Sequence, residues 1–225
     1  MEVKKINAII TGTTGMVGEG VLHECLNHPQ VESVLVINRR PCGVEHEKLK
    51  EIIHGDFYDL STIKDQLNGY NACYFCMGVS SIGMKESDYH RITYDLTMHM
   101  AVTLHKYNPD MIFNYVSGEG TTGNENAKTM WVRVKSKTEN DLLKLFKTAY
   151  MFRPGYIQPT KGLKNAYKIY SITAPFYPIL KTLFPGYVCT LNDLGMAMIN
   201  STLYGYEKRV LVNKDITGLA KYNEK

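Results

Sequence analysis

The sequence lacks long apolar runs, has few cysteines and carries little net charge. No uninterrupted apolar stretch reaches the roughly 18 residues that a membrane-spanning helix requires, and the apolar stretch near the N-terminus is shorter than a signal-peptide core. The five cysteines form an odd-numbered set, which suits a reducing compartment better than a disulfide framework. We therefore expect a cytoplasmic protein with no integral membrane segment.

The charge balance also argues against a nucleic-acid partner. Lysine and arginine number 26 against 22 aspartate and glutamate in 225 residues, a net charge of +4, and no basic run is longer than two residues. With 44% hydrophobic and 21% charged residues, the composition is typical of a folded domain. A chain of this length can bury a sizeable core without disulfides or a structural metal.

Short β-branched apolar runs alternate with helical patterns through most of the chain. Strands are predicted over 6–11, 31–38, 49–54, 71–76, 111–117, 149–153 and 209–213, and helices over 16–27, 86–106, 127–147 and 191–204. The segment between residues 38 and 49 is too short for a full helix. This alternation predicts an α/β protein with a Rossmann-type doubly wound parallel sheet.

The pattern changes after Arg153, where five of the eight prolines lie. No linker separates this part from the rest, so we expect one Rossmann-type domain over residues 1–225, with an excursion over 156–205 that forms a small C-terminal substrate region. The apolar stretch 169–188 is predicted to be a lid or pocket wall, with a subunit contact in a homodimer or a membrane-surface patch as alternatives. Thr190 and Asp193 have the spacing of a capping box at a helix start.

A glycine-rich loop lies between the first predicted strand and the first predicted helix. It contains Gly12, Thr14, Gly15, Met16, Val17 and Gly18, with the spacing Gly-x-x-Gly-x-x-Gly. Glycines in this position let backbone amides approach a pyrophosphate, and the helix N-terminus adds partial positive charge. The loop therefore predicts a binding site for a dinucleotide cofactor.

The loop and its context resemble those of the extended and atypical short-chain dehydrogenase/reductase group. This group includes NAD(P)-dependent epimerase/dehydratase-like proteins and NmrA-like and Tat-interacting-protein-like members. The resemblance implies further cofactor contacts after three other strands. These contacts would be made by Asp56 and Phe57 near the adenine, by Cys76, Met77 and Gly78 beneath the cofactor, and by Pro154 and Gly155 near the nicotinamide.

The end of the second strand bears on which cofactor binds. Asn38, Arg39 and Arg40 lie where an acidic residue would accept hydrogen bonds from the ribose diol of NAD, whereas arginine can hold the additional phosphate of NADP. We therefore expect NADP(H) in preference to NAD. The alternative is that the two arginines pair with surface carboxylates.

The resemblance also implies a catalytic serine and a Tyr-x-x-x-Lys pair. Ser117 and Lys135 match this pattern, but Trp131 occupies the tyrosine position. An indole cannot ionise near neutral pH, so the usual proton donor is missing. Tyr156, with Tyr94 as a second choice, is the predicted substitute. An ordered water could also supply the proton, the protein could bind the cofactor without turnover, and Trp131 could simply pack in the core.

Two functions follow from these observations. The first is an NADP(H)-dependent oxidoreductase or epimerase/dehydratase acting on a small carbonyl or hydroxyl substrate. The second is a non-catalytic NADP(H)-binding redox sensor or regulatory scaffold.

We expect no metal site, because Cys73 and Cys76 lie three apart in a predicted strand and their side chains point to opposite faces.

Overall fold

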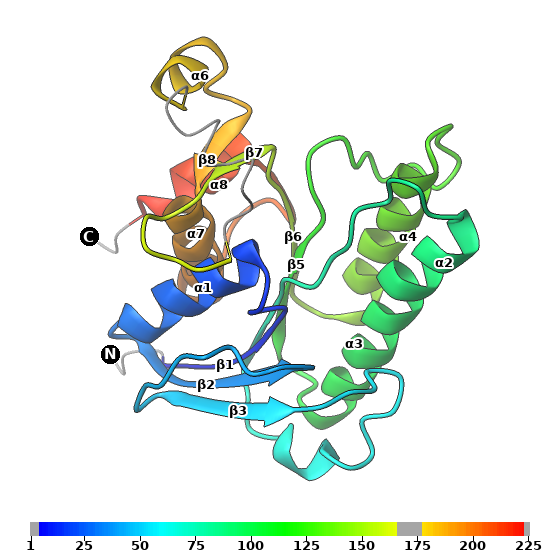
Figure 1. Ribbon diagram of the computed structural model, residues 1–225, viewed down its shortest axis with the longest axis vertical. Coiled ribbons are helices and arrows are strands. Elements are labelled where there is room, and N and C mark those ends of the chain that lie inside the picture. Colours follow the sequence, from blue (N-terminus) through cyan, green and yellow to red (C-terminus); the bar gives the residue numbers. More distant parts are fainter. Residues whose placement is uncertain (1–4, 166–176, 223–225) are drawn as a thin grey trace.

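The computed structural model describes residues 5–165 and 177–222, in which a parallel sheet lies between two layers of helices (Figure 1). The strand order is β3-β2-β1-β4-β5-β6-β9, and every neighbouring pair is parallel. The strands are β1 (Ile6–Thr11), β2 (Val31–Asn38), β3 (Leu49–Ile53), β4 (Ala72–Phe75), β5 (Ile112–Val116), β6 (Ala149–Arg153) and β9 (Val210–Val212). The predicted Rossmann-type sheet is confirmed.

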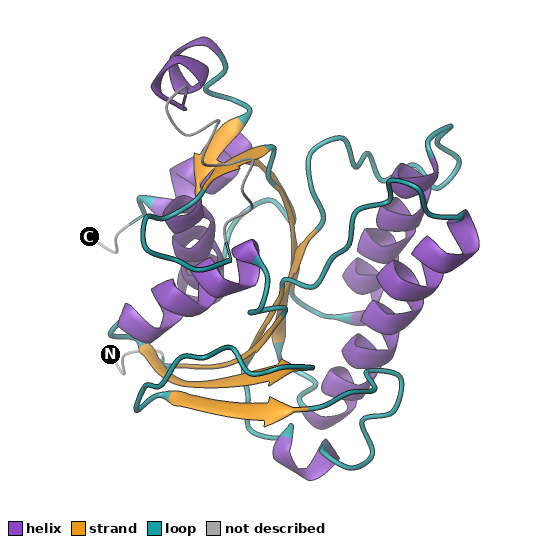
Figure 2. Cartoon of the chain, in the orientation of Figure 1, coloured by secondary structure: helices purple, strands orange, loops and turns teal. Residues whose placement is uncertain are grey.

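Helices cover both faces of this sheet (Figure 2). One layer contains α1 (Met16–Asn27), α7 (Leu191–Tyr204) and α8 (Asn213–Ala220), and the other contains α2 (Glu86–His90), α3 (Leu96–Tyr107) and α4 (Met130–Leu145). A short 3₁₀ helix, η1 (Lys64–Gln66), precedes β4, and β7 (Tyr156–Gln158) pairs with β8 (Val188–Thr190) in a separate two-stranded sheet. This arrangement places all the carboxyl ends of the central strands along one edge.

The continuous apolar strands follow from burial on both faces. In β1, Ala8 and Ile10 belong to the core under α1 and α7, whereas Ile9 belongs to the core under α3 and α4. In β2, Val36 belongs to the core under α1 and α7, and Ile37 belongs to the core under α3 and α4. Because successive side chains alternate between faces and both faces are covered, no position in these strand centres is left for a polar residue.

Several element boundaries agree with the sequence predictions, and others do not. The segments 6–11, 16–27, 31–38, 149–153 and 191–204 are confirmed, and Thr190 forms a capping box with Asp193, whose backbone N–H donates to the Thr190 hydroxyl at 2.9 Å. Helix α8 was not predicted, and its first residue, Asn213, was assigned to the last predicted strand. The predicted helix 127–147 is shorter at both ends.

The predicted helix over 86–106 contains an irregularity. Helix α2 continues into a π-helical turn, η2 (Arg91–Asp95), before α3 begins. A π turn accommodates more residues than an α turn and therefore changes which side chains face a given neighbour. Here Tyr89, before the turn, and Ile92 and Leu96, in and after it, all face cavities.

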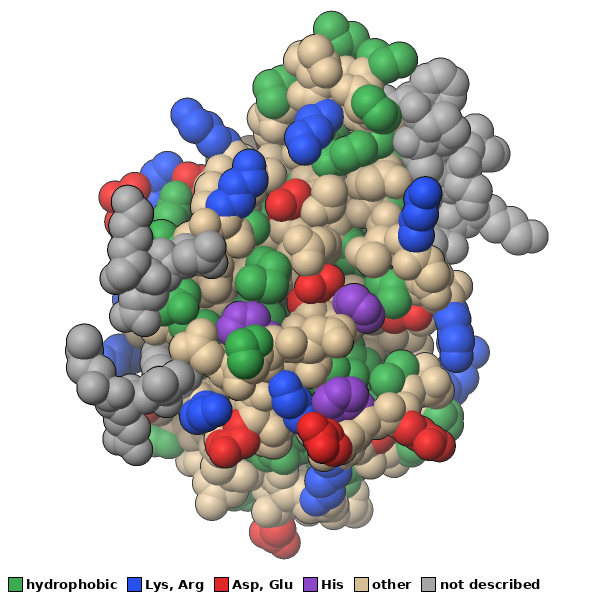
Figure 3. All heavy atoms as spheres, turned by 90° about the vertical axis from the view of Figure 1, so that its left-hand side faces the viewer, with side chains coloured by type: hydrophobic (Ala, Val, Ile, Leu, Met, Phe, Trp, Pro, Cys, Tyr) green, Lys and Arg blue, Asp and Glu red, His purple; other side chains and the backbone are tan. Residues whose placement is uncertain are grey.

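Helix α6 (Tyr177–Leu183) projects beyond the body of the protein (Figure 1). Ile179, Leu183, Phe184 and Tyr187 are exposed, and hydrophobic side chains gather at this projecting end in Figure 3. Part of the predicted lid, residues 169–176, lies outside the described residues, so its role stays a prediction. Within the described ranges, no helix is long and apolar enough to cross a membrane.

Candidate functional site

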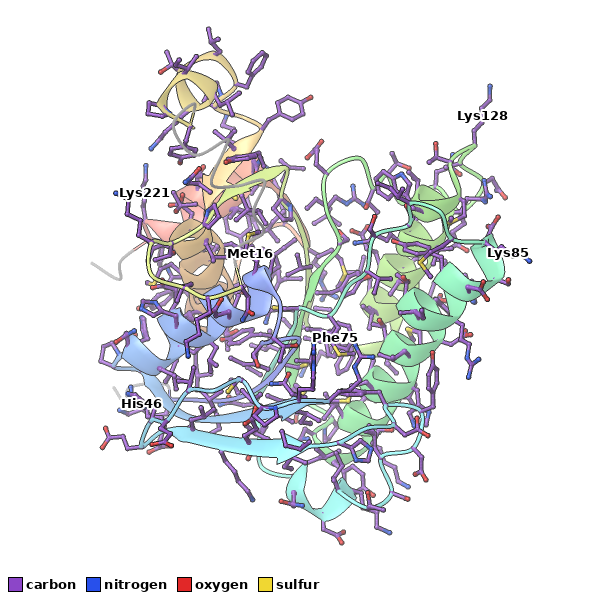
Figure 4. The ribbon with its side chains drawn as sticks, viewed as in Figure 1. Met16, His46, Phe75, Lys85, Lys128 and Lys221 are labelled. Carbon is purple, nitrogen blue, oxygen red and sulfur yellow. The ribbon has the colours of Figure 1, made fainter. Side chains whose placement is uncertain are left out.

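Three adjoining cavities lie at the carboxyl ends of the central strands. The glycine-loop cavity, of about 380 Å³, borders Gly12, Thr14, Asn38, Arg39 and Asp56. The middle cavity, of about 260 Å³, borders Met16, Val17 and Ile157, and the outer cavity, of about 440 Å³, borders Tyr89, Glu119 and Trp131. In Figure 4, Met16 at the start of α1 and Phe75 at the end of β4 mark this region, whereas Lys85 and Lys128 lie at the outer edge of the α2–α4 layer.

The cavities form one trough because neighbouring ones share walls. Gly15, Cys76, Met77 and Gly78 border both the glycine-loop and the middle cavity. Ser117, Gly118, Lys135 and Pro154 border both the middle and the outer cavity. An elongated ligand in the trough would therefore pass from the glycine loop to Lys135.

The three glycines of the loop differ in what a side chain at each position would contact. Gly12 has a φ of +77°, and a Cβ there would lie 2.8 Å from the backbone of Cys76 and Met77. A Cβ on Gly18 would overlap the carbonyl oxygen of Gly12, so this glycine allows α1 to pack on the loop. A Cβ on Gly15 would meet only the Gly12 oxygen, at 3.4 Å. The protein alone therefore does not require glycine at position 15, which leaves that space for a ligand.

The end of β2 combines a buried amide with an exposed cation. The Asn38 side-chain amide donates to the hydroxyl of Thr13 at 2.6 Å and to a carboxylate oxygen of Glu51 at 3.1 Å. These bonds fix Asn38 between the glycine loop and β3. Arg39 is exposed and borders the glycine-loop cavity, whereas Arg40 is exposed and does not border it.

A buried ion pair lies beneath the other end of the trough. Glu139, on α4, is 1% exposed and accepts hydrogen bonds from Arg153 at the end of β6, from Nε at 3.0 Å and from Nη2 at 2.5 Å. The Ser117 hydroxyl donates to Glu139 at 2.5 Å and is also 3.2 Å from the carbonyl oxygen of Phe152. Both acceptors belong to the protein, so the single hydroxyl hydrogen of Ser117 is used internally.

Lys135 lies one helical turn before Glu139 and faces the junction of the middle and outer cavities. Its ammonium group donates to the backbone carbonyl oxygen of Ser117. Burial lowers the pKa of Lys135 to about 8, and the negative charge of Glu139 partly offsets this effect. A group with this pKa changes its charge close to neutral pH, which is suited to proton transfer.

Trp131 lies one turn before Lys135 and is half-buried at the outer cavity. Its ring packs against Gly120, where a Cβ would be 2.9 Å from the indole. It belongs to neither buried core cluster, and no hydrogen bond of its N–H is seen within the part of the chain that the structure describes. The interpretation of Trp131 as only a core residue therefore does not describe its position, because one side of the indole faces the cavity.

The predicted site residues divide into two groups by position. Most of them border at least one cavity: Gly12, Thr14, Gly15, Met16, Val17, Asn38, Arg39, Asp56, Phe57, Cys76, Met77, Gly78, Ser117, Lys135, Pro154 and Gly155. Gly18, Arg40 and Tyr156 do not. The Tyr156 hydroxyl donates to Gln158 at 3.0 Å. The second tyrosine considered, Tyr94, donates to Asp141 at 2.8 Å and also borders none of these cavities.

The structure brings three further residues to this end of the trough, and sequence reasoning had singled out only Tyr89, near the start of the long predicted helix, as able to face the pocket mouth. Tyr89 is 1% exposed and borders the outer cavity, and burial raises the pKa of its hydroxyl. Glu119 is exposed at the same cavity. Glu139 lies four residues after Lys135, and this spacing was the available signal. Helical periodicity places both on one face, but sequence alone does not show that the carboxylate is buried.

The family model for the NAD dependent epimerase/dehydratase family matches residues 8–143, well over half of the chain. The chain belongs to this family. The matched range covers the glycine loop, Ser117, Trp131, Lys135 and Glu139, and ends before β6. The resemblance inferred from the glycine loop and the Lys135 segment is therefore confirmed.

Solved structures with the same fold extend the similarity over almost the whole chain. The Bordetella bronchiseptica enzyme WbmF in complex with NAD+ is 12% identical, with a TM-score of 0.65, and the match covers 97% of this chain and 78% of WbmF. The Helicobacter pylori ADP-L-glycero-D-manno-heptose-6-epimerase is 15% identical, with a TM-score of 0.66 and coverages of 98% and 83%. A UDP-glucose-4-epimerase from Stenotrophomonas maltophila with bound NAD is 12% identical, with a TM-score of 0.65 and coverages of 92% and 78%. At these identities the likeness concerns the fold.

Proposed function

We propose that this protein is an NADP(H)-dependent oxidoreductase that interconverts a small carbonyl compound and the corresponding alcohol, or an epimerase or dehydratase that uses the same chemistry. The observation that carries the proposal is the position of Lys135 and Ser117, which border both the middle and the outer cavity. A cofactor in the trough and a substrate in the outer cavity would meet beside these two residues. The family membership, and similar structures with bound NAD, support a dinucleotide in this trough.

The residues of the trough fit a nicotinamide dinucleotide. Gly15 leaves room at the start of α1, where free backbone N–H groups and the helix dipole favour a pyrophosphate. Asp56 and Phe57 would hold the adenine end, and Met77, Gly78 and Pro154 would line the nicotinamide end. When bound, the cofactor would supply or accept hydride. The protein would hold both reactants and move the proton.

The preference for NADP(H) rests on Arg39. Its exposed guanidinium borders the glycine-loop cavity at the end of β2, whereas the carboxylate of Glu51 on β3 already accepts hydrogen bonds from Asn38 and from the backbone N–H of Cys42. Arginine can hold a ribose phosphate with two aligned donors. The similar structures named above with a bound cofactor hold NAD or NAD+, so Arg39 alone supports the preference for NADP(H).

The cofactor experiment is a titration of NADPH and NADH, followed by fluorescence or calorimetry. Wild type should bind NADPH at least tenfold more tightly than NADH, and Arg39→Ala should lose most of that difference while binding NADH as before. Arg40→Ala is the matched control and should leave the ratio within twofold, because Arg40 does not border the cavity. Equal affinity of wild type for the two cofactors would refute the preference.

A second candidate function is a non-catalytic NADP(H) sensor or scaffold, and the observation that favours it is Trp131 in place of an ionisable residue. The two functions differ in turnover. Loss of NADPH absorbance with a panel of small aldehydes and ketones, abolished in Lys135→Ala, supports the enzyme. Tight NADPH binding without turnover, together with a partner that binds only one redox form, supports the sensor. The cytoplasmic location and the homodimer stay predictions.

A further inference from the structure

The outer cavity contains few groups that can move a proton. Its walls include hydroxyl groups of Ser80 and Ser81, the phenol of Tyr89, the indole of Trp131 and the ammonium group of Lys135. Serine hydroxyls and indole do not ionise near neutral pH. The hydrogen of the Ser117 hydroxyl is directed to Glu139 or Phe152, so Ser117 can only accept a hydrogen bond from a ligand.

Three ionisable groups therefore compete, Glu119, Tyr89 and Lys135. Tyr89 is buried on α2, and its desolvation raises the pKa of the phenol, which makes the phenolate harder to form. Tyr89 and the exposed Glu119 border only the outer cavity, whereas Lys135 borders both the middle and the outer cavity. Lys135 thus lies where the two reactants would meet.

The ammonium group of Lys135 retains donors after its bond to the protein. It has three N–H groups, and the carbonyl oxygen of Ser117 uses one of them. The Ser117 backbone anchors the nitrogen at the end of β5, and Glu139 one turn further along α4 keeps a negative charge beneath it. The geometry leaves Lys135 able to hold a cofactor hydroxyl and to reach a substrate oxygen.

We propose that Lys135 is itself the proton donor for carbonyl reduction, and the proton acceptor for alcohol oxidation, in place of the missing tyrosine. This inference rests on the proposed oxidoreductase function. In reduction the carbonyl carbon receives hydride from the reduced nicotinamide, and the carbonyl oxygen receives a proton from the Lys135 ammonium. The C=O double bond becomes a C–O single bond bearing O–H, and the neutral amine regains its proton from water.

The charged and titratable groups around Lys135 come from every element packed near it. They are Glu139 on α4, Arg153 at the end of β6, Glu119 after β5, Tyr115 on β5, Tyr89 on α2 and Cys76 after β4. Arg153 is paired with Glu139, and burial raises the pKa of Tyr115, Tyr89 and Cys76, so these three stay protonated near neutral pH. Lys135, with a pKa of about 8, is the group expected to change charge there.

The first readout needs neither cofactor nor substrate. Reductive methylation with ¹³C-formaldehyde labels the lysines, and the resonance of Lys135 is assigned by its absence in Lys135→Arg. We expect this resonance to titrate with a midpoint near pH 8, about two pH units below the ordinary lysine value. A Lys135 resonance that titrates with the exposed lysines would overturn the proposal, whether or not a substrate is known.

The second readout is the pH profile of turnover in matched variants. Lys135→Arg keeps the positive charge but does not titrate in this range, so NADPH affinity should stay within about fivefold while kcat falls at least 100-fold. In wild type, kcat for reduction should fall above pH 8 and kcat for oxidation should rise. Tyr89→Phe should lower kcat much less than Lys135→Arg does. A large loss in Tyr89→Phe with a mild effect in Lys135→Arg would assign the proton to Tyr89 and refute the proposal.

The proposed oxidoreductase function and the assignment of the proton to Lys135 can be refuted separately. If wild type does not bind NADPH, the proposed function fails irrespective of the Lys135 titration. If NADPH binds and turnover occurs, but the pH profile of Lys135→Arg equals that of wild type, only the assignment of the proton to Lys135 fails.

Discussion

Arg153 holds the carboxylate of Glu139 with two nitrogen atoms, Nε at 3.0 Å from one oxygen and Nη2 at 2.5 Å from the other. The carboxylate is 1% exposed and the arginine side chain 14%. The same oxygen that accepts from Nε also accepts from the Ser117 hydroxyl. This ion pair therefore connects α4, β5 and β6 directly beneath the residues proposed to act on the substrate.

Removing one partner should leave the other charge buried and unpaired. We expect Glu139→Ala to lower the free energy of unfolding by about 3 to 5 kcal/mol, and Glu139→Gln to lower it less, because the amide can still accept from Arg153. The measurement is urea denaturation followed by circular dichroism. Glu86→Ala is the control, since Glu86 is exposed and its partner Arg133 is only half-buried, and it should change the midpoint very little. Equal small effects in Glu139→Ala and Glu86→Ala would contradict a structural role for the buried pair.

The glycine loop allows protein stability to be separated from cofactor binding. Gly12→Ala should lower the free energy of unfolding by at least about 1 to 2 kcal/mol, because its φ is positive and its Cβ would meet the backbone of Cys76. Gly15→Ala should change this free energy by less than about 0.5 kcal/mol. It should nevertheless weaken NADPH binding more than tenfold, because the added methyl group would fill space at the cavities.

A helix glycine remote from the cavities provides the control for these two variants. A Cβ on Gly218, in α8, would meet nothing within 4 Å, so Gly218→Ala should raise the free energy of unfolding by up to about 1 kcal/mol and leave NADPH binding unchanged. Thermal unfolding and NADPH titration of all three variants test the prediction. Unchanged NADPH affinity in Gly15→Ala would contradict the assignment of that space to the cofactor.

Lys135 should make stability depend on pH in a defined window. Its pKa is about 8 in the folded protein and 10.5 in the reference state, so the unfolded chain binds more protons between these values. Wild-type stability should therefore rise with pH from 8 to 10.5 relative to Lys135→Met. Over this range, the difference in the free energy of unfolding between wild type and Lys135→Met can change by about 3 kcal/mol. Urea denaturation of both proteins at pH 7.5, 9 and 10.5 measures it, and a constant difference would show that Lys135 is not desolvated.

The sequence predicted the parts of the site that depend on local pattern. The loop around Gly12 and Gly15 has a recognisable spacing next to a buried strand, and Ser117 and Lys135 match a family motif. These residues come to one trough because the carboxyl ends of parallel strands share an edge. The placement of Arg39 beside the cavity, with Arg40 away from it, depends on which way each side chain leaves the end of β2, and sequence pattern does not give this.

The part that was missed depends on contacts between distant segments. The π turn after Tyr89 was not anticipated, because a 3.6-residue period predicts a continuous helix. The buried carboxylate of Glu139 is paired with Arg153, which comes from β6. Tyr156 was predicted to act in catalysis because it follows the Arg153 turn, but it begins β7, and its N–H donates to the carbonyl oxygen of Tyr187 at 2.9 Å. That pairing with the C-terminal segment was not visible in the local sequence.

Trp131→Tyr tests whether the site retains the geometry of an ionisable pair. The phenol would lie one helical turn before Lys135, whose positive charge should lower its pKa and make it a second proton donor at the outer cavity. We expect kcat for carbonyl reduction to rise at least tenfold, whereas Trp131→Phe should give no gain because it lacks a proton to transfer. Initial rates of NADPH oxidation, with Kd for NADPH measured in parallel, separate chemistry from binding. A gain in kcat in Trp131→Tyr but not in Trp131→Phe would mean that the substrate oxygen lies within reach of position 131. No gain in either, with NADPH affinity unchanged, would mean that the substrate oxygen lies away from position 131.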